Sequence, residues 1–265
     1  MNLRTISALV LRYIFLYTRS PMRLVELVFW PVVDLVVWGN VTVFIQKNTD
    51  PAFGNFVLFF LGGMILWDIM FRAQQGVAIS FLEDVWTKNL LNIFSAPVRP
   101  VEYVAATCVM GVLRIAVTVT VLSVLAWLGY HFSIFQFEWR LIPWFGLLML
   151  FGWSLGIIST SLILRWGQAA ESLAWAVPFL LQPVAAVYYP LGQLPGWAQT
   201  LGLCLPCTTV FEAMRDVVRG QPTQTWHLVH ALVLNAIWLS AAALIYMAVL
   251  RKGRKNGTLT RVTSH

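Results

Sequence analysis

Four charged side chains stand inside long apolar stretches of this sequence: Asp34, Asp68, Arg72 and Arg114. A charge in hydrocarbon costs about 3 kcal/mol or more unless it is paired or reached by water. Asp68 and Arg72 are four residues apart, so on a helix they share a face and are expected to form an ion pair. Asp34 and Arg114 could either bridge two apolar segments or face a polar pathway between them.

A second charged group follows the i, i+3, i+4, i+7 spacing of one helix face: Glu212, Arg215, Asp216 and Arg219. Acids and bases that alternate at this spacing can neutralise one another along the helix. We interpret the group as a ladder of ion pairs that braces an outer gate, rather than as a catalytic site.

Two short motifs suggest covalent chemistry. The serine in Gly152-Trp-Ser-Leu-Gly156 has the spacing of a hydrolase nucleophile. However, it is predicted to lie within a membrane-spanning helix, about 20 Å from the start of that helix. His227 and His230, which begin the last span, would be far from it. Close packing of small residues is the favoured explanation. Cys204 and Cys207 form a Cys-x-x-Cys that could be a redox pair, a disulfide or half of a soft-metal site. No second pair or nearby histidine completes four ligands, so we expect apolar fillers, with a local disulfide as the alternative.

The segment 81–97 mixes aromatic and aliphatic residues with Glu83, Asp84 and Lys88. It is typical of a short amphipathic helix, stopped by Pro97 and Pro100. Such a helix could enter a groove on a soluble partner, with its charges setting the register, or it could rest on lipid.

Composition decides what kind of molecule positions these groups. Hydrophobic residues make up 59% of the 265 residues and charged residues 11%, whereas soluble domains have roughly 25% charged residues. The net charge of +7 comes from Lys and Arg beside apolar segments, which favours anionic lipid over nucleic acid as their partner. Gly-x-x-x-x-Gly-Lys-Ser/Thr is absent from the sequence, so ATP would have to be handled elsewhere.

The pattern predicts a single all-α integral membrane domain over residues 1–265. Its first part, 1–24, is expected to be a basic amphipathic helix on the membrane surface. Two short helices that dip in and return are expected over 190–225, where prolines and glycines are dense. Six spans of about 20 apolar residues or more are predicted at 26–46, 53–77, 101–128, 139–164, 169–189 and 226–250, and a tail at 251–265.

The distribution of Lys and Arg predicts the orientation. Positive residues gather on the side of the N-terminus, which the positive-inside rule places in the cytoplasm. Both termini are then cytoplasmic, and the number of spans is even. That side holds Arg4, Arg12, Arg19, Arg23, Arg72, Lys88, Arg99, Arg165, Arg251, Lys252, Arg254, Lys255 and Arg261, against Lys47, Arg140, Arg215 and Arg219 on the other.

Two stretches carry a resemblance to a known family. They are LEDVWTKNLLNIFSAPVRPVEYV, at Leu82 to Val104, and LPGWAQTLGLCLPCTTVFEAMRDVVRG, at Leu194 to Gly220. With the order of spans around them, they resemble the type-2 ABC transporter permeases over nearly the whole chain. In that family the first is similar to the coupling helix and the second to the re-entrant outer helices. This chain has Leu205-Pro206-Cys207 where the family usually has Asn-Pro or Ser-Pro.

The resemblance implies a permease subunit of an exporter in the bacterial inner membrane. It implies two copies of an ABC ATPase subunit, which carry ATP and Mg²⁺, a second permease chain, expected to make a homodimer, and no cofactor on this chain. Amphipathic, lipidic or lipid-linked glycan substrates are carried by similar proteins. The alternatives are an ion-coupled carrier or metal transporter and an intramembrane serine hydrolase. ATPase coupling is expected at Glu83, Asp84, Trp86, Lys88 and Leu91.

Overall fold

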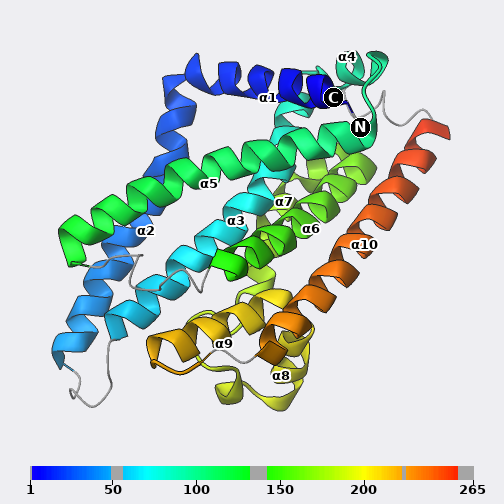
Figure 1. The fold of residues 1–265 in the computed structure, drawn as a ribbon. Helices are drawn as coiled ribbons and strands as arrows, with labels where there is room; N and C mark the ends of the chain where they lie inside the picture. The colour runs from blue at the N-terminus through cyan, green and yellow to red at the C-terminus, as the bar shows by residue number, and fades with distance from the viewer. Residues whose placement is uncertain (1, 49–55, 132–141, 223–224, 256–265) are drawn as a thin grey trace.

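The computed structural model describes residues 2–48, 56–131, 142–222 and 225–255, and every regular element in these ranges is a helix (Figure 1). The predicted spans 53–77 and 139–164 begin in residues outside these ranges. The elements are α1 (Leu3–Thr18), α2 (Pro21–Asn48), α3 (Phe56–Trp86), α4 (Leu90–Ser95), α5 (Pro100–Tyr130), α6 (Ile142–Trp166), η4 (Gly167–Ala170), α7 (Glu171–Leu181), η5 (Leu191–Gln193), α8 (Gly196–Leu203), α9 (Pro206–Val218) and α10 (Thr225–Lys255).

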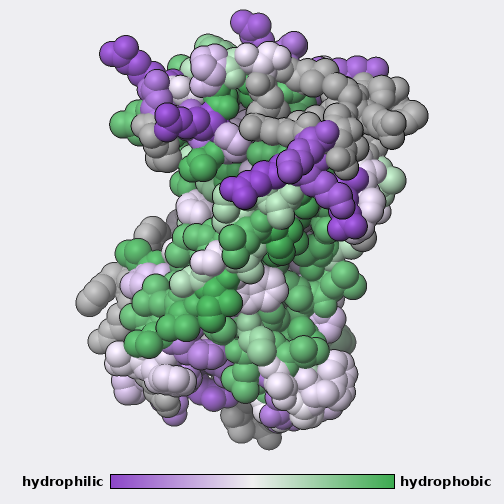
Figure 2. All heavy atoms as spheres, turned by 90° about the vertical axis from the view of Figure 1, so that its right-hand side faces the viewer, coloured by the Kyte–Doolittle hydropathy of each residue, from purple (hydrophilic) through white to green (hydrophobic). Residues whose placement is uncertain are grey.

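The long helices run side by side as a bundle whose two ends differ (Figure 1). Helix α1 lies across the upper end in that view, together with α4 and the last turns of α10, and we call this the α1 end. Helices α8 and α9 lie at the opposite end, the α9 end. Apolar side chains form a band across the middle of the bundle (Figure 2). Hydrophilic side chains lie at the two ends, most densely at the α1 end.

Four of the described helices are long and apolar enough to cross a membrane: α2, α5, α6 and most of α10, over Thr225–Gly253. Helix α3 is 31 residues long but is not among them, and it carries Asp68, Arg72, Glu83 and Asp84. Helix α7 has only 11 residues, and Pro178 lies within it. The predicted fifth span, 169–189, therefore differs from the structure, in which the helix ends at Leu181 and an irregular segment follows.

Close approach of backbones builds the centre of the bundle. Gly156 of α6 lies against α3, where an added Cβ would come within 2.7 Å of the Gln74 carbonyl oxygen. Gly76 of α3 meets Gly111 of α5 in the same way. Glycine at these contacts lets helices approach to a distance that a side chain would prevent. Helix α3 is thereby held between α5 and α6.

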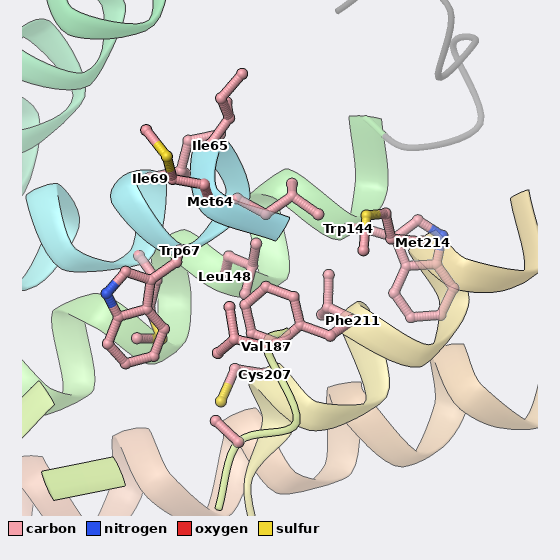
Figure 3. Close-up of a cluster of buried hydrophobic side chains, with 14 of the residues drawn as sticks. Met64, Ile65, Trp67, Ile69, Trp144, Leu148, Val187, Cys207, Phe211 and Met214 are labelled. Carbon is pink, nitrogen blue, oxygen red and sulfur yellow. The ribbon is translucent and has the colours of Figure 1, made fainter. Parts of the chain in front are cut away.

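A large apolar cluster joins the α9 end to this centre (Figure 3). Phe211 and Met214 of α9 pack with Met64 of α3 and with Trp144 and Leu148 of α6. Phe211 and Met214 are fully buried. Helix α9 is thus part of the protein core.

Helix α1 buries one stripe of residues and exposes the rest. Ile6, Leu9, Tyr13 and Tyr17 are the buried positions, spaced by three and four as a helix face requires. Arg19 and Ser20 interrupt the helix, and Pro21 opens α2, a position that proline favours. The amphipathic helix expected over 1–24 is thus shorter in the structure, because it ends at Thr18 and α2 begins at Pro21.

Candidate functional site

A cleft of about 680 Å³ lies between α2, α3, α5 and α7, and it combines aromatic and charged walls. Helix α2 contributes Glu26, Trp30, Asp34 and Trp38, which follow one another at intervals of four residues. This spacing places them on one face of the helix, one above the other. The cleft is in the volume range of sites that hold small molecules.

The wall opposite α2 is built by α3 and α7. Trp67 and Phe71 of α3 line the cleft, as do Trp175 and Phe179 of α7. The rings of Phe71 and Phe179 lie 5.2 Å apart between centroids, so α3 and α7 meet through their aromatic side chains. The result is a cleft with indole and phenyl rings on three helices.

Asp68 and Arg72 form the ion pair that their spacing predicts, with Arg72 Nε 3.2 Å from Asp68 Oδ1. The guanidinium also donates from Nη1 to Gln75 Oε1 at 3.3 Å. The second oxygen of Asp68, Oδ2, is buried and has no hydrogen-bond partner among the described residues. One oxygen of Asp68 therefore pairs with Arg72, and the other can still accept a hydrogen bond.

Asp34 and Arg114 both line the cleft, but they do not bridge their helices to each other. Asp34 lies in the electrostatic range of Arg72 and Asp68, without a hydrogen bond or ion pair in the part of the chain that is described. Arg114 donates to Ser80 Oγ at 3.1 Å and lies 3.9 Å from Glu83 Oε2. Of the two roles that the sequence left open, the bridge is not formed.

Asp84 lies at the α1 end and is completely buried. It accepts hydrogen bonds from the hydroxyls of Tyr13, at 2.6 Å, and Tyr103, at 2.7 Å, and it pairs with Arg12. Burial and the neighbouring Asp84 raise the pKa of Tyr13 above its ordinary value, so the phenol stays protonated and donates. Helix α1 is thus anchored to α3 and α5 through this carboxylate.

Glu83 makes the neighbouring anchor. Tyr17 donates to Glu83 Oε1 at 3.2 Å, and guanidinium nitrogens of Arg23 and Arg114 lie 3.9 Å from its two oxygens. Burial raises the pKa of Tyr17 to about 12, although Arg114 opposes the shift. Because Glu83 also lines the cleft, this anchor connects the surface helix with the cleft wall.

The expectation that 81–97 forms one short amphipathic helix is therefore corrected. Helix α3 continues to Trp86, so Glu83 and Asp84 belong to its last turns and face inward. Lys88 takes a left-handed conformation, with φ of 53°, and separates α3 from α4. Leu91 lies in α4, and its side chain is outside the described set.

The exposed part of this region follows the end of α3. Trp86 is 44% exposed, and its indole nitrogen donates to Glu171 Oε2 of α7 at 3.3 Å. Thr87, Lys88 and Asn92 are exposed as well. A partner protein approaching the α1 end would meet these side chains and not the two carboxylates.

The predicted ladder on α9 is only partly formed. Arg215 and Glu212 make an ion pair at 2.9 Å, but Arg215 turns into the core and is 1% exposed. Its guanidinium donates to carbonyl oxygens beyond α7, with the Tyr189 oxygen at 2.6 Å. Asp216 pairs with His227 of α10 at 3.7 Å, and Arg219 is exposed. Arg215 thus keeps the pair with Glu212 but does not continue the ladder to Asp216, because its guanidinium supplies the donors that buried carbonyls need.

Ser154 and the two outer cysteines have ordinary surroundings. Ser154 is fully buried and donates to the Leu150 carbonyl of its own helix at 2.9 Å. Cys204 and Cys207 are free thiols, the first exposed and the second buried. The disulfide that their spacing allowed is not formed.

Sequence reasoning missed most of the cleft. Glu26 was not singled out, nor were Trp175, Phe179 and Gln75, although the four-residue spacing of Glu26, Trp30, Asp34 and Trp38 is a readable signal of one helix face. The partners of Asp84 could not be found this way, because Tyr13 and Tyr103 are 71 and 19 residues away.

Comparison with known proteins places these features in context. A family model described as ABC-2 family transporter protein matches residues 35–251. ABC transporter G family member 20 of Dictyostelium discoideum is 26% identical over 228 residues, 83% of this chain and 31% of that protein. The capsule polysaccharide export inner-membrane protein BexB of Haemophilus influenzae is 22% identical over 176 residues, 66% of this chain and 58% of BexB. The chain thus spans less than two thirds of either relative.

Proposed function

Because the chain belongs to the ABC-2 family of transporter membrane proteins, we propose that it is the permease subunit of an exporter driven by a separate ATPase subunit. The observation that carries this proposal is the cleft between α2, α3, α5 and α7, where charged groups and aromatic rings share one space inside an apolar bundle. Charges at such a depth are retained where they serve a pathway.

The proposed substrate is amphipathic, lipidic or a lipid-linked glycan, moved outward. The similarity to BexB, a capsule polysaccharide export protein, supports the glycan class. Aromatic rings of the cleft can stack on sugar or acyl groups, and carboxylates and guanidiniums can bind hydroxyls. A pathway of this mixed chemistry suits a molecule with an apolar part and a polar part.

The proposed topology has six spans in a bacterial inner membrane, with the α1 end in the cytoplasm. Helices α2, α3, α5, α6, α7 and α10 would be the spans, and α8 and α9 would be re-entrant from the outer side. Glu212 and Arg215 would brace an outer gate there. The basic residues of the α1 end, Arg4 and Arg19 among them, support this orientation by the positive-inside rule.

The proposed assembly is a homodimer with two ATPase subunits, which hold ATP and Mg²⁺. Apolar side chains that α2 leaves exposed, such as Phe29, Val37 and Phe44, would face lipid or the second copy. The ATPase would dock on Trp86, Lys88 and α4, and the adjoining anchor at Glu83 would carry its movement to the cleft. Nucleotide must bind two arrangements of the assembly with different affinity for this to work.

Co-purification tests the proposal. The tagged chain in mild detergent should retain an ATPase of about 25–40 kDa, an ordinary domain size, and the double change Trp86→Ala, Lys88→Glu should release it. Trp197→Ala is the matched control, because Trp197 is 67% exposed at the α9 end. A wild-type chain that purifies without an ATPase would refute the exporter and favour an ion-coupled carrier.

The serine hydrolase is disfavoured by the placement of Ser154, whose hydroxyl is buried and donates within its own helix. An ion-coupled carrier would use Asp34 and Asp68 and would move its substrate without ATP. Transport that continues after loss of the ATPase would identify it.

A further inference from the structure

We propose that the cleft binds a positively charged organic group, an ammonium carried by an amphipathic substrate, at Asp34 of α2. This inference rests on the proposed transport function and names the substrate class that the same cleft would take.

The charges that line the cleft are not balanced on the α2 side. Four carboxylates line it, with three guanidiniums. Arg72 is bound to Asp68 and Gln75, and Arg23 and Arg114 both approach Glu83. Glu26 and Asp34 are left without an ion pair among the described residues. A cationic ligand would supply the missing charge.

Asp34 stands between two indoles of its own helix. Trp30 and Trp38 lie one turn before and one turn after it and line the same cleft. Trp38 also packs against Phe60, with centroids 5.7 Å apart, and Phe60 stacks on Tyr188 at 4.8 Å. Aromatic faces around a carboxylate attract organic ammonium groups through the ring quadrupole.

The aromatic faces on α2 are still available to a ligand. Arg72 lies over the ring of Phe71, at 5.9 Å, and Arg114 over Tyr17, at 4.7 Å. Within the described ranges, no side-chain cation is placed over Trp30 or Trp38. These two indoles, each one turn from Asp34 on α2, can therefore receive a cation from outside the chain.

Asp68 provides a second acceptor across the cleft. Its Oδ2 atom has no hydrogen-bond partner in the described part of the protein, and the residue lies within electrostatic range of Asp34. A protonated amine between the two carboxylates could donate to both, which a neutral sugar would do more weakly. An anionic ligand at this position would be repelled by the Asp34 carboxylate. It would find no available guanidinium nearby, because each of them already contacts a carboxylate of the protein.

The test uses two probes of the same shape and opposite charge, tetraphenylphosphonium and tetraphenylborate. The full chain in lipid nanodiscs is titrated with each radiolabelled ion, and empty nanodiscs correct for partition into lipid. We expect saturable binding of the cation only. Asp34→Asn should weaken it about tenfold, and Trp30→Leu severalfold.

Glu102→Gln is the matched control, because Glu102 is a buried carboxylate at the α1 end that accepts from the backbone amides of Asn2 and Arg99. This variant should bind tetraphenylphosphonium as the wild type does. Three results would overturn the cation site. The first is equal binding of the two probes, and the second is binding of the cation that Asp34→Asn leaves unchanged. The third is full displacement of the cation by KCl at matched ionic strength.

Failure of this inference is distinguishable from failure of the exporter. Loss of cation binding with a co-purified ATPase would remove the site and leave the permease function standing. Cation binding that follows Asp34 in a chain that retains no ATPase would keep the site and refute the exporter.

Discussion

Asp84 is a carboxylate with no exposed surface, and it is tolerated because its oxygens are fully used. Two phenols and one guanidinium donate to it, which compensates the loss of hydration that burial imposes. Its neighbour Glu83 has weaker contacts, at 3.2 to 3.9 Å. These two adjacent acids thus differ in role: Glu83 reaches the cleft, and Asp84 holds α1 in place.

Asp84→Asn should destabilise the protein by about 2 kcal/mol, because Arg12, which is 27% exposed, loses its counter-charge and one phenol loses its acceptor. The unfolding midpoint should fall by roughly 5 °C. In the Cys204→Ser background, which removes the exposed thiol, it can be followed by the reaction of the buried Cys207 thiol with a fluorogenic reagent. Asp216→Asn is the control, since its histidine partner is 3.7 Å away and its change should be smaller. Equal midpoints for Asp84→Asn and wild type would contradict the anchor.

Helix α6 carries a matched pair of glycines that isolates the effect of helix contact. Gly156→Ala places a methyl group 2.7 Å from both the Gln74 carbonyl oxygen and Val77 Cβ of α3, and such overpacking costs about 1–3 kcal/mol. Gly146→Ala meets nothing within 4 Å and should gain up to about 1 kcal/mol of helix propensity. Unfolding midpoints of the two variants should therefore move in opposite directions. Destabilisation of both to the same degree would show that backbone flexibility matters there and not contact with α3.

Apolar length and proline were enough to predict the long helices α2, α5, α6 and α10, because each signal lies within one segment. The same signals failed around Glu83, where a charged run looked like a separate surface helix. The charges there are neutralised by Arg12 and Arg114, which come from elsewhere in the chain. The ladder on α9 is incomplete for the same reason: Arg215 pairs with Glu212 but also donates to carbonyl oxygens that lie beyond α7. Contacts between distant segments decided what local patterns could not.

The orientation of the whole molecule can be tested with one native thiol, Cys204, and one introduced at position 96. Cys204 is exposed and Cys207 is buried, both at the α9 end. A membrane-impermeant maleimide added to intact spheroplasts should label wild type but not Cys204→Ser, since that end is proposed to face outward. Ala96→Cys in the Cys204→Ser background, exposed near α4 at the α1 end, should react only after the membrane is opened. The reverse pattern would invert the topology.

The tyrosines of α1 also set an order of assembly during synthesis. Tyr13 leaves the ribosome before both of its partners: its acceptor Asp84 follows 71 residues later, and its neighbour Tyr103 follows 90 residues later. Until then, the apolar stripe of α1 can be covered by lipid, as in an amphipathic helix on a membrane surface. Helix α1 is therefore docked through Tyr13 only after α3 and the start of α5 have been made.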